Sequence, residues 1–160
     1  MENIVYTRVD DRLVHGQVMT AWVQVTKASE VLIVDDNVAK DTFLQMIMKS
    51  AMPNKVSLKV VSINEAKDYI ENQGKDKKLF ILVKTPITIV KLHEHGVDIQ
   101  KLGIGGMGAS EDRTTLFRNI SASEEEKQAL IQLKNLGVDV FFQVTPDNTK
   151  VRLNNVLKGE

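Results

Sequence analysis

Short apolar runs alternate with segments of helical spacing along the whole chain, and this alternation limits the fold more than any other feature. Two runs, VLIV at 31–34 and LFILV at 79–83, are almost unbroken, which is typical of strands covered on both faces. Strands and helices that alternate in this way build a mostly parallel sheet with helices on both faces. We therefore expect a single-domain, open α/β fold of this kind.

The strands and helices can be placed from these patterns and from their boundary signals. Strands are expected at Asn3–Arg8, Val31–Asp35, Val56–Ser62, Leu79–Lys84 and Val138–Val144, with a weaker one at Asp98–Leu102. The helices expected between them are Gln17–Val25, Val38–Met52, Asn64–Asn72, Ile87–His95 and Ser123–Leu136.

Several of these helix ends carry recognisable signals. Ser123 followed by Glu126 fits a capping box, Pro53 ends the second helix, and Gly96 and Gly137 suit left-handed C-terminal caps. In the second helix, the apolar residues are expected on the core side: Phe43, Leu44, Met46, Met48 and Met52. The only long irregular segment expected is Gly103–Thr115, which is a candidate functional loop.

Composition narrows the class of protein. The length of 160 residues suits one domain spanning 1–160, and 21 basic residues balance 21 acidic ones, which argues against a nucleic-acid partner. The chain has no cysteine, so disulfides and thiolate metal sites are excluded. The N-terminus lacks the apolar stretch of a signal peptide and no apolar run is long enough to span a membrane. We expect a cytoplasmic protein that acts at a membrane only through a partner.

Ligands of open α/β sheets bind beyond the carboxyl ends of the strands, so residues there are the first candidates for a site. The segment RVDDRLVHGQV, residues 8–18, places two arginines, two aspartates and a histidine between the first strand and the first helix. A turn has no need of these arginines and this histidine unless an anion is held there. The other candidate segments are 35–37, 84–86 and the glycine-rich run 103–108.

The chemistry of residues 8–18 fits a phosphohistidine. Neutral imidazole is a nucleophile near pH 7, and an arginine can hold phosphate oxygens with two parallel hydrogen bonds. A helix beginning near Gly16 offers free backbone N–H groups to the phosphate. Asp10 or Asp11 could orient Arg12 or the imidazole of His15, and so fix which ring nitrogen is free to attack.

These residues resemble the phosphorylation motif of the IIB components of mannose-type (mannose, fructose, sorbose) bacterial phosphotransferase systems. The VDD at 34–36, the KTP at 84–86 and the GGMG at 105–108 also look like that family's pattern, so the resemblance covers essentially the whole chain. It implies that His15 accepts a phosphoryl group from a IIA protein and passes it to a sugar that enters through membrane IIC and IID components.

The resemblance also assigns the neighbouring residues. It implies that Arg12 contacts the phosphate, that Arg8 is a second basic contact, and that phosphate is carried on Nδ1 of His15. Other phosphate-binding residues are expected at Gly16 and Gln17, and an orienting or partner-facing role is expected at Asp10, Asp11, Lys84, Thr85, Gly105 and Gly106. No metal or other cofactor is required, and a homodimer is suggested. The sugar is not identified by the sequence.

Three other interpretations compete with this one. GIGGMG at 103–108 satisfies the glycine spacing of a dinucleotide site, but no helical periodicity follows it. Asp35 and Asp36 resemble the acidic pair of a receiver domain, but the strand at 56–62 is not followed by an aspartate that could accept phosphate. A pure interaction module would take up no phosphate at all.

His93 and His95 are expected to be surface residues, because a spacing of two turns them to different sides of a helix.

Overall fold

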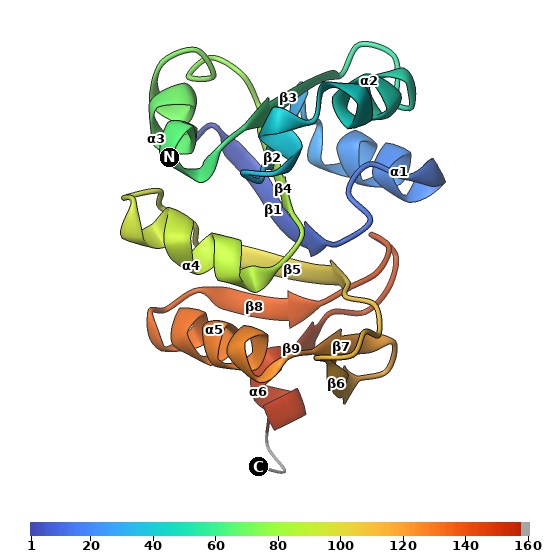
Figure 1. Ribbon diagram of the computed structural model, residues 1–160, viewed down its shortest axis with the longest axis vertical. Coiled ribbons are helices and arrows are strands. Elements are labelled where there is room, and N and C mark those ends of the chain that lie inside the picture. Colours follow the sequence, from blue (N-terminus) through green and yellow to red (C-terminus); the bar gives the residue numbers. More distant parts are fainter. Residues whose placement is uncertain (158–160) are drawn as a thin grey trace.

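The computed structural model describes residues 1–157, which form a seven-stranded sheet in the order β3-β2-β4-β1-β5-β8-β9 (Figure 1). All neighbours in this sheet pair in parallel except β8 and β9, which are antiparallel. The strands of the sheet are β1 Ile4–Asp10, β2 Glu30–Val34, β3 Ser57–Val61, β4 Leu79–Val83, β5 Lys101–Gly106, β8 Asp139–Phe142 and β9 Val151–Arg152. The expected open, mostly parallel α/β fold is confirmed.

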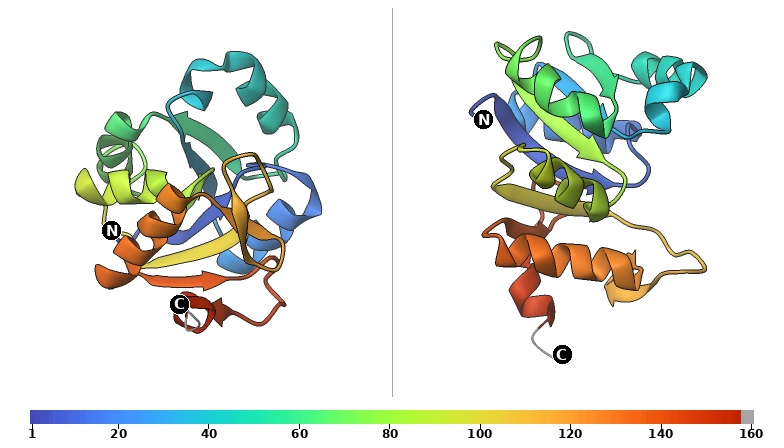
Figure 2. Two further views of the ribbon diagram at one scale, coloured as in Figure 1. Left: turned by 60° about the horizontal axis from the view of Figure 1, so that its bottom comes forward. Right: turned by 60° about the vertical axis from the view of Figure 1, so that its left-hand side comes forward.

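Helices cover both faces of the sheet. In the left view of Figure 2, α4 and α5 lie on one side of the strands and α1 lies on the other. The helices are α1 Gly16–Thr26, α2 Thr42–Ser50, α3 Ile63–Glu71, α4 Pro86–Glu94, α5 Glu124–Asn135 and the short α6 Leu153–Val156, with a 3-10 turn, η1, at Val38–Lys40. A separate antiparallel hairpin, β6 Thr114–Phe117 and β7 Ile120–Ala122, lies beside the tips of β5 and β8.

The central strands feed two hydrophobic cores by the two-residue alternation of a pleated sheet. Ile33 and Leu82 point to the core under α1 and α2, whereas Leu32 and Ile81 point to the core under α3, α4 and α5. All four side chains are fully buried, and burying each one contributes roughly 1.5–3 kcal/mol. The unbroken apolar runs of β2 and β4 are therefore needed for both faces.

Two expected elements have shifted bounds that matter here, and β6, β7, β9 and α6 were not expected. The second helix begins at Thr42 rather than Val38, because the Asp41 carboxylate accepts a hydrogen bond from the backbone N–H of Leu44 at 3.0 Å and caps the helix there. The assignment of the apolar residues of this helix to the core is wrong for Phe43 and Met46, whose exposed fractions are 67% and 60%. Only Met48 among the residues of α2 is buried.

The fifth strand also differs. It was expected at Asp98–Leu102 but runs over Lys101–Gly106, so the first glycines of the supposed irregular loop are strand residues. The expected capping box at Ser123 and Glu126 is present, and Gly96 and Gly137 have φ of +87° and +91° just beyond α4 and α5. None of the helices within residues 1–157 has the length and apolar character needed to cross a membrane.

The sheet brings three strand ends together at one edge. The arrowheads of β1, β5 and β8 point the same way in Figure 1, and Asp10, the last residue of β1, is paired with Gly106, the last residue of β5. The chain after β1 leads to a helix on one face, and the chain that enters β5 comes from a helix on the other. The ends of β1 and β5 therefore lie where ligands bind in open α/β sheets.

Candidate functional site

The loop between β1 and α1 is shaped by its own first residue. The side-chain Oδ1 of Asp10 accepts a hydrogen bond from the backbone N–H of Arg12 at 3.1 Å, and its carbonyl oxygen accepts one from Leu13 at 2.9 Å. These two bonds turn the chain sharply back. The turn leaves Leu13 at φ +58° and Gly16 at φ +48°, and it ends at His15, the N-cap residue of α1.

Asp10 is the centre of a cluster of polar side chains. Its carboxylate is 1% exposed and accepts hydrogen bonds from Nε and Nη2 of Arg12 at 3.0 and 3.1 Å. Burial acts to raise the pKa of Asp10, but the hydrogen bonds from Arg12 and His15 and the charge of Arg8 outweigh it and leave the pKa below its ordinary value. Asp10 is therefore ionised at neutral pH and can only accept hydrogen bonds.

This ionised carboxylate fixes the imidazole. Nε2 of His15 lies 3.1 Å from Oδ2 of Asp10. Because the carboxylate can only accept, Nε2 must carry the hydrogen, and Nδ1 of the neutral ring is then left with its lone pair. The side chain of His15 is 25% exposed, so the ring is oriented by a buried partner while still open to solvent.

The start of α1 adds an electropositive surface next to the ring. His15 caps the helix without a side-chain hydrogen bond, and the first turn contains no acidic residue. The first N–H groups of a helix have no partner within the helix, and the helix dipole is positive at this end. Gly16 and Gln17 are both exposed here, and nothing lies within 4 Å of the place where a Cβ of Gly16 would stand. The start of α1 can therefore receive an anion next to His15.

Arg12 is the cation that borders the exposed side of this cluster. Its side chain is 53% exposed although Nε and Nη2 are both bonded to Asp10. The hydrogen bonds from Arg12 to Asp10 hold the pKa of Arg12 above its ordinary value, so it stays charged. Nη1 makes no hydrogen bond within residues 1–157, and it is therefore available to a bound anion.

Arg8 was expected to be a second basic contact of the phosphate. It is instead buried, because it lies inside β1 and is 1% exposed. Nη1 and Nη2 each donate to a backbone carbonyl at 2.8 Å, those of Gln143 and Val144, and the guanidinium carbon lies 4.9 Å from the ring centre of Trp22. Arg8 therefore ties β1 to the segment after β8, and its charge lies behind Asp10 rather than at the surface.

Gly105 and Gly106 allow this close packing. A Cβ on Gly105 would stand 2.0 Å from the guanidinium carbon of Arg8, and a Cβ on Gly106 would stand 2.5 Å from Oδ1 of Asp10. Both glycines were expected to have an orienting or partner-facing role. The structure shows that the close approach is made by side chains of β1 against the backbone of β5.

Within residues 1–157, the Asp11 carboxylate forms no hydrogen bond with Arg12 or His15. Its Oδ2 accepts hydrogen bonds from the backbone N–H of Gly108 and from Nη1 of Arg113, both at 2.8 Å. Arg113 also forms two hydrogen bonds of 2.8 Å with the carboxylate of Glu126, and this carboxylate accepts the hydroxyl of Thr85 at 2.8 Å. This chain of contacts, which we call the Arg113 network, joins the β1–α1 loop, the β5–β6 loop and helices α4 and α5.

The Arg113 network contains two predicted residues, Asp11 and Thr85, and it contains Arg113, which was missed. Thr85 caps α4 and belongs to this network rather than to the His15 cluster, while Lys84 is half-buried and forms no ion pair within residues 1–157. Arg113 was not singled out, because an arginine in a polar loop carries no local signal of its partners. The only sequence feature that could have drawn attention to it is its place in the candidate loop.

The other sequence features are structural where they are described. Asp35 accepts hydrogen bonds from the backbone of Asn37 and Val38, and Asp36 accepts one from Ile63, so both aspartates fix turns. His95 is exposed and its ring contacts Asn64 and the carbonyl of Lys91. Within residues 1–157 no three histidine or acidic side chains are placed to hold a metal ion.

Comparison with known proteins decides the family. The family model described as "PTS system sorbose subfamily IIB component" matches residues 4–160. The chain belongs to this family. The solved structure of the IIB domain of the sorbose permease from Klebsiella pneumoniae superimposes with a TM-score of 0.93 and 30% identity, over 98% of this chain and 96% of that one.

Curated relatives agree with this assignment. The fructose-specific EIIB component of Bacillus subtilis is 30% identical over 99% of this chain and 98% of its own length. The N-acetylgalactosamine-specific IIB component 1 of Escherichia coli is 32% identical over 94% of this chain and 96% of its own. The mannose-specific EIIAB component of Escherichia coli is 27% identical and is matched over 47% of its length. This chain is therefore an EIIB component of a sugar phosphotransferase system.

Proposed function

We propose that this EIIB component carries a phosphoryl group on Nδ1 of His15, between a phosphorylated EIIA protein and a sugar. The observation that carries this proposal is the 3.1 Å contact between Nε2 of His15 and the buried, ionised Asp10, which leaves Nδ1 as the nucleophile. Membership of the family supports transfer to a sugar, and the local geometry supports the choice of atom.

Each part of the cluster has a role in the proposed transfer. The lone pair of Nδ1 forms a new bond to phosphorus while the bond between phosphorus and the donor breaks, in line and through a loose transition state. Nη1 of Arg12 and the free N–H groups of α1 hold the phosphate oxygens. The negative charge of Asp10 stabilises the ring as it becomes positive on phosphorylation, because Nε2–H already points at it.

The donor is proposed to be a EIIA protein of the same system. The mannose-specific relative is named an EIIAB component, and the part of it outside the match makes up about half of its length. A EIIA unit joined to a EIIB unit in one chain supports direct transfer between the two. The acceptor is proposed to be a sugar delivered by the membrane EIIC and EIID components, so that this chain works at the cytoplasmic side of the membrane.

The test is phosphorylation with purified components. The chain is incubated with phosphoenolpyruvate, the general phosphotransferase proteins and a EIIA protein of the family, and its intact mass and peptides are then measured. We expect one phosphoryl group on the peptide that contains His15, lost in acid and kept in alkali. A His15→Asn variant should take up none, whereas a His93→Asn variant should be phosphorylated like the wild type. Phosphorylation of the His15→Asn variant would rule out the assigned residue.

A further inference from the structure

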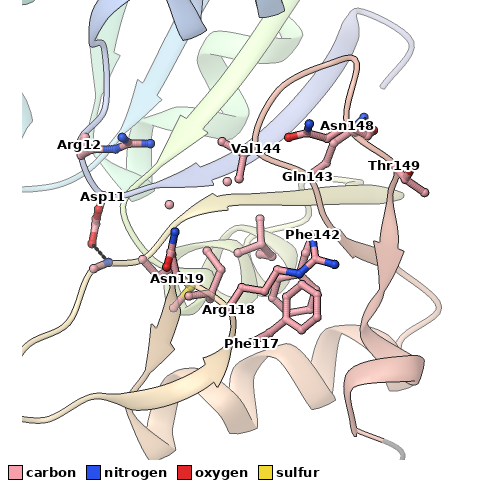
Figure 3. A pocket seen from close by; sticks show the side chains of 16 residues that line it. Asp11, Arg12, Phe117, Arg118, Asn119, Phe142, Gln143, Val144, Asn148 and Thr149 are labelled. Atoms are coloured by element: carbon pink, nitrogen blue, oxygen red, sulfur yellow. Dashed lines mark hydrogen bonds between the residues drawn. The ribbon is translucent and has the colours of Figure 1, made fainter.

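A cavity of about 390 Å³ opens beside Arg12, at the carboxyl ends of β5 and β8. The β6–β7 hairpin forms its other wall, and Figure 3 shows Arg12 on one side of it and Phe117 on the other. Its volume lies in the range of small-molecule pockets, which is about 300–1,000 Å³. Arg12 is the one lining residue that has a role in the proposed transfer from EIIA to His15.

The inner walls are largely apolar and contain two aromatic rings. The rings of Phe117 and Phe142 lie 5.0 Å apart between their centres, and Ile104, Met107 and Ile120 complete the buried part of the wall. Aromatic faces of this kind pack against the C–H surfaces of small molecules. The inner part of the cavity therefore suits a compact ligand with at least one apolar face.

The rim of the cavity is polar and positively charged. Arg12 lies on the side of the His15 cluster, and Arg118 lies on the hairpin, with its guanidinium carbon 4.7 Å from the ring centre of Phe117. The acidic residue of the rim, Asp11, is neutralised, because its carboxylate is bonded to Arg113 and to the backbone of Gly108. The rim therefore attracts an anionic group, and Asn119 and Asn148 add hydrogen-bonding side chains.

The walls are fixed before any ligand binds. The Arg113 network holds the β5–β6 loop against Asp11 and α5, and the backbone N–H of Ser121 donates to the carbonyl of Met107 at 2.9 Å. Arg113 is only 14% exposed, so these ion pairs are shielded from solvent. A wall held by such contacts keeps its shape, which lowers the cost of binding a small ligand.

The polar side chains of the rim favour a polar ligand. Nε2 of Gln143 donates to the carbonyls of Pro146 and Asn148, which fixes this part of the wall. An apolar side chain from a partner protein would leave Asn119, Asn148 and the charge of Arg118 without a new partner.

We propose that this cavity binds a hexose phosphate, the product of the sugar phosphorylation in which this chain takes part. This inference rests on the proposed function. Arg12 and Arg118 at the rim attract the phosphate, the C–H face of the sugar packs on Phe117 and Phe142, and the hydroxyls bond to polar side chains such as Asn119 and Asn148. Because Arg12 also belongs to the His15 cluster, bound product competes with phosphorylation of His15.

The experiment follows the methyl groups of the wall by NMR. The whole chain is titrated with phosphates of mannose, fructose and N-acetylgalactosamine, and separately with the free sugars and with inorganic phosphate. We expect at least one hexose phosphate to shift the methyl signals of Ile104, Met107, Ile120 and Val144, and to bind at least tenfold more tightly than inorganic phosphate or free sugar. The methyl signals of Ile33, in the opposite core, should stay unchanged.

The variant that tests the rim is Arg118→Asn, since asparagine tolerates the φ of +50° at this position. It should weaken binding of the hexose phosphate about tenfold, because a charge-assisted hydrogen bond to the phosphate is lost. The matched control is Lys55→Asn, which removes another exposed cation at a positive φ, +69°, away from the cavity. The control should bind like the wild type.

Three results would overturn the inference. Equal affinity for inorganic phosphate would mean that only the anion site of the His15 cluster is occupied. Lack of binding by every hexose phosphate would leave the cavity without this role. Weakened affinity of Arg118→Asn for EIIA, together with no response to hexose phosphates, would make the cavity a protein-docking site. Normal phosphorylation of His15 in the same samples would show that the proposed function stands even where this inference fails.

Discussion

Asp10 is 1% exposed and its Oδ2 lies 3.1 Å from Nε2 of the partly exposed His15. A buried, ionised carboxylate thus selects the tautomer of a ring that is open to solvent on its other side. The same carboxylate holds Arg12, so the nucleophile and the cation share one anchor. This arrangement makes Asp10 the residue whose replacement should be most informative.

Replacing Asp10 by asparagine should slow phosphorylation of His15 by on the order of 10²-fold or more, because an amide no longer fixes the Nε2–H tautomer or stabilises the positive ring. Long-range ¹H–¹⁵N NMR should show a mixture of the two ring tautomers in place of one. Asp41→Asn is the matched control, since asparagine caps a helix as well as aspartate. An Asp10→Asn variant with wild-type rate and a single tautomer would contradict the assigned role.

Replacing Arg12 by alanine should lower the rate of phosphoryl transfer far more than it lowers the stability of the fold. The side chain is half exposed but donates two hydrogen bonds to the buried Asp10, so the free energy of unfolding should fall by about 1–2 kcal/mol and the variant should still fold. Phosphorylation by EIIA should slow by about 10²–10³-fold, the usual cost of removing one donor that stabilises the transition state. Quench-flow kinetics measure the rate of phosphorylation, and urea unfolding measures the stability. Unchanged kinetics in a folded variant would remove Arg12 from the site.

Arg8 should show the opposite pattern. Arg8→Met should lower the free energy of unfolding by about 2–4 kcal/mol, because a buried carbonyl of Gln143 loses its donor and Asp10 loses a nearby positive charge. Urea unfolding compared with Arg12→Met, which removes the neighbouring exposed arginine, gives the measurement. Equal stability of the two variants would show that Arg8 is not the structural residue described here.

Two glycines of the same run should differ sharply. Gly105→Ala places a Cβ 2.0 Å from the guanidinium carbon of Arg8, whereas at Gly108 the nearest atom, Oδ2 of Asp11, lies at an ordinary 3.7 Å. Overpacking of this kind costs about 1–3 kcal/mol or more, so Gly105→Ala should lower the unfolding midpoint in thermal melts. Gly108→Ala should melt like the wild type. Similar melting of both variants would disprove the close contact.

The fold could be predicted from the sequence where local pattern decides it. The runs that became β2 and β4 are apolar enough to be recognised as central strands, and Ser123 with Glu126 marks the start of α5 through contacts within one turn. The start of α2 was placed too early, at Val38, because the apolar pattern begins there. The helix in fact begins after Asp41, whose side chain caps it. β5 was placed too early because its glycines hide its strand character.

The site could be predicted only in part, for a related reason. One segment of six residues contains His15, Arg12 and Asp10. A local motif is therefore enough to predict that they lie together. Arg8 stands in the same segment, but its partners are carbonyls 135 and 136 positions away in the chain. Arg113 likewise meets Asp11 across 102 positions, and no local pattern reports such a contact.

The most direct test of the account is the position of the phosphate on the ring. The chain is labelled with ¹⁵N at its histidines, phosphorylated through EIIA and followed by long-range ¹H–¹⁵N and ³¹P NMR. The account predicts a single adduct on Nδ1 of His15, with Nε2 still carrying its hydrogen toward Asp10. Phosphate on Nε2, or on another residue, would contradict the account.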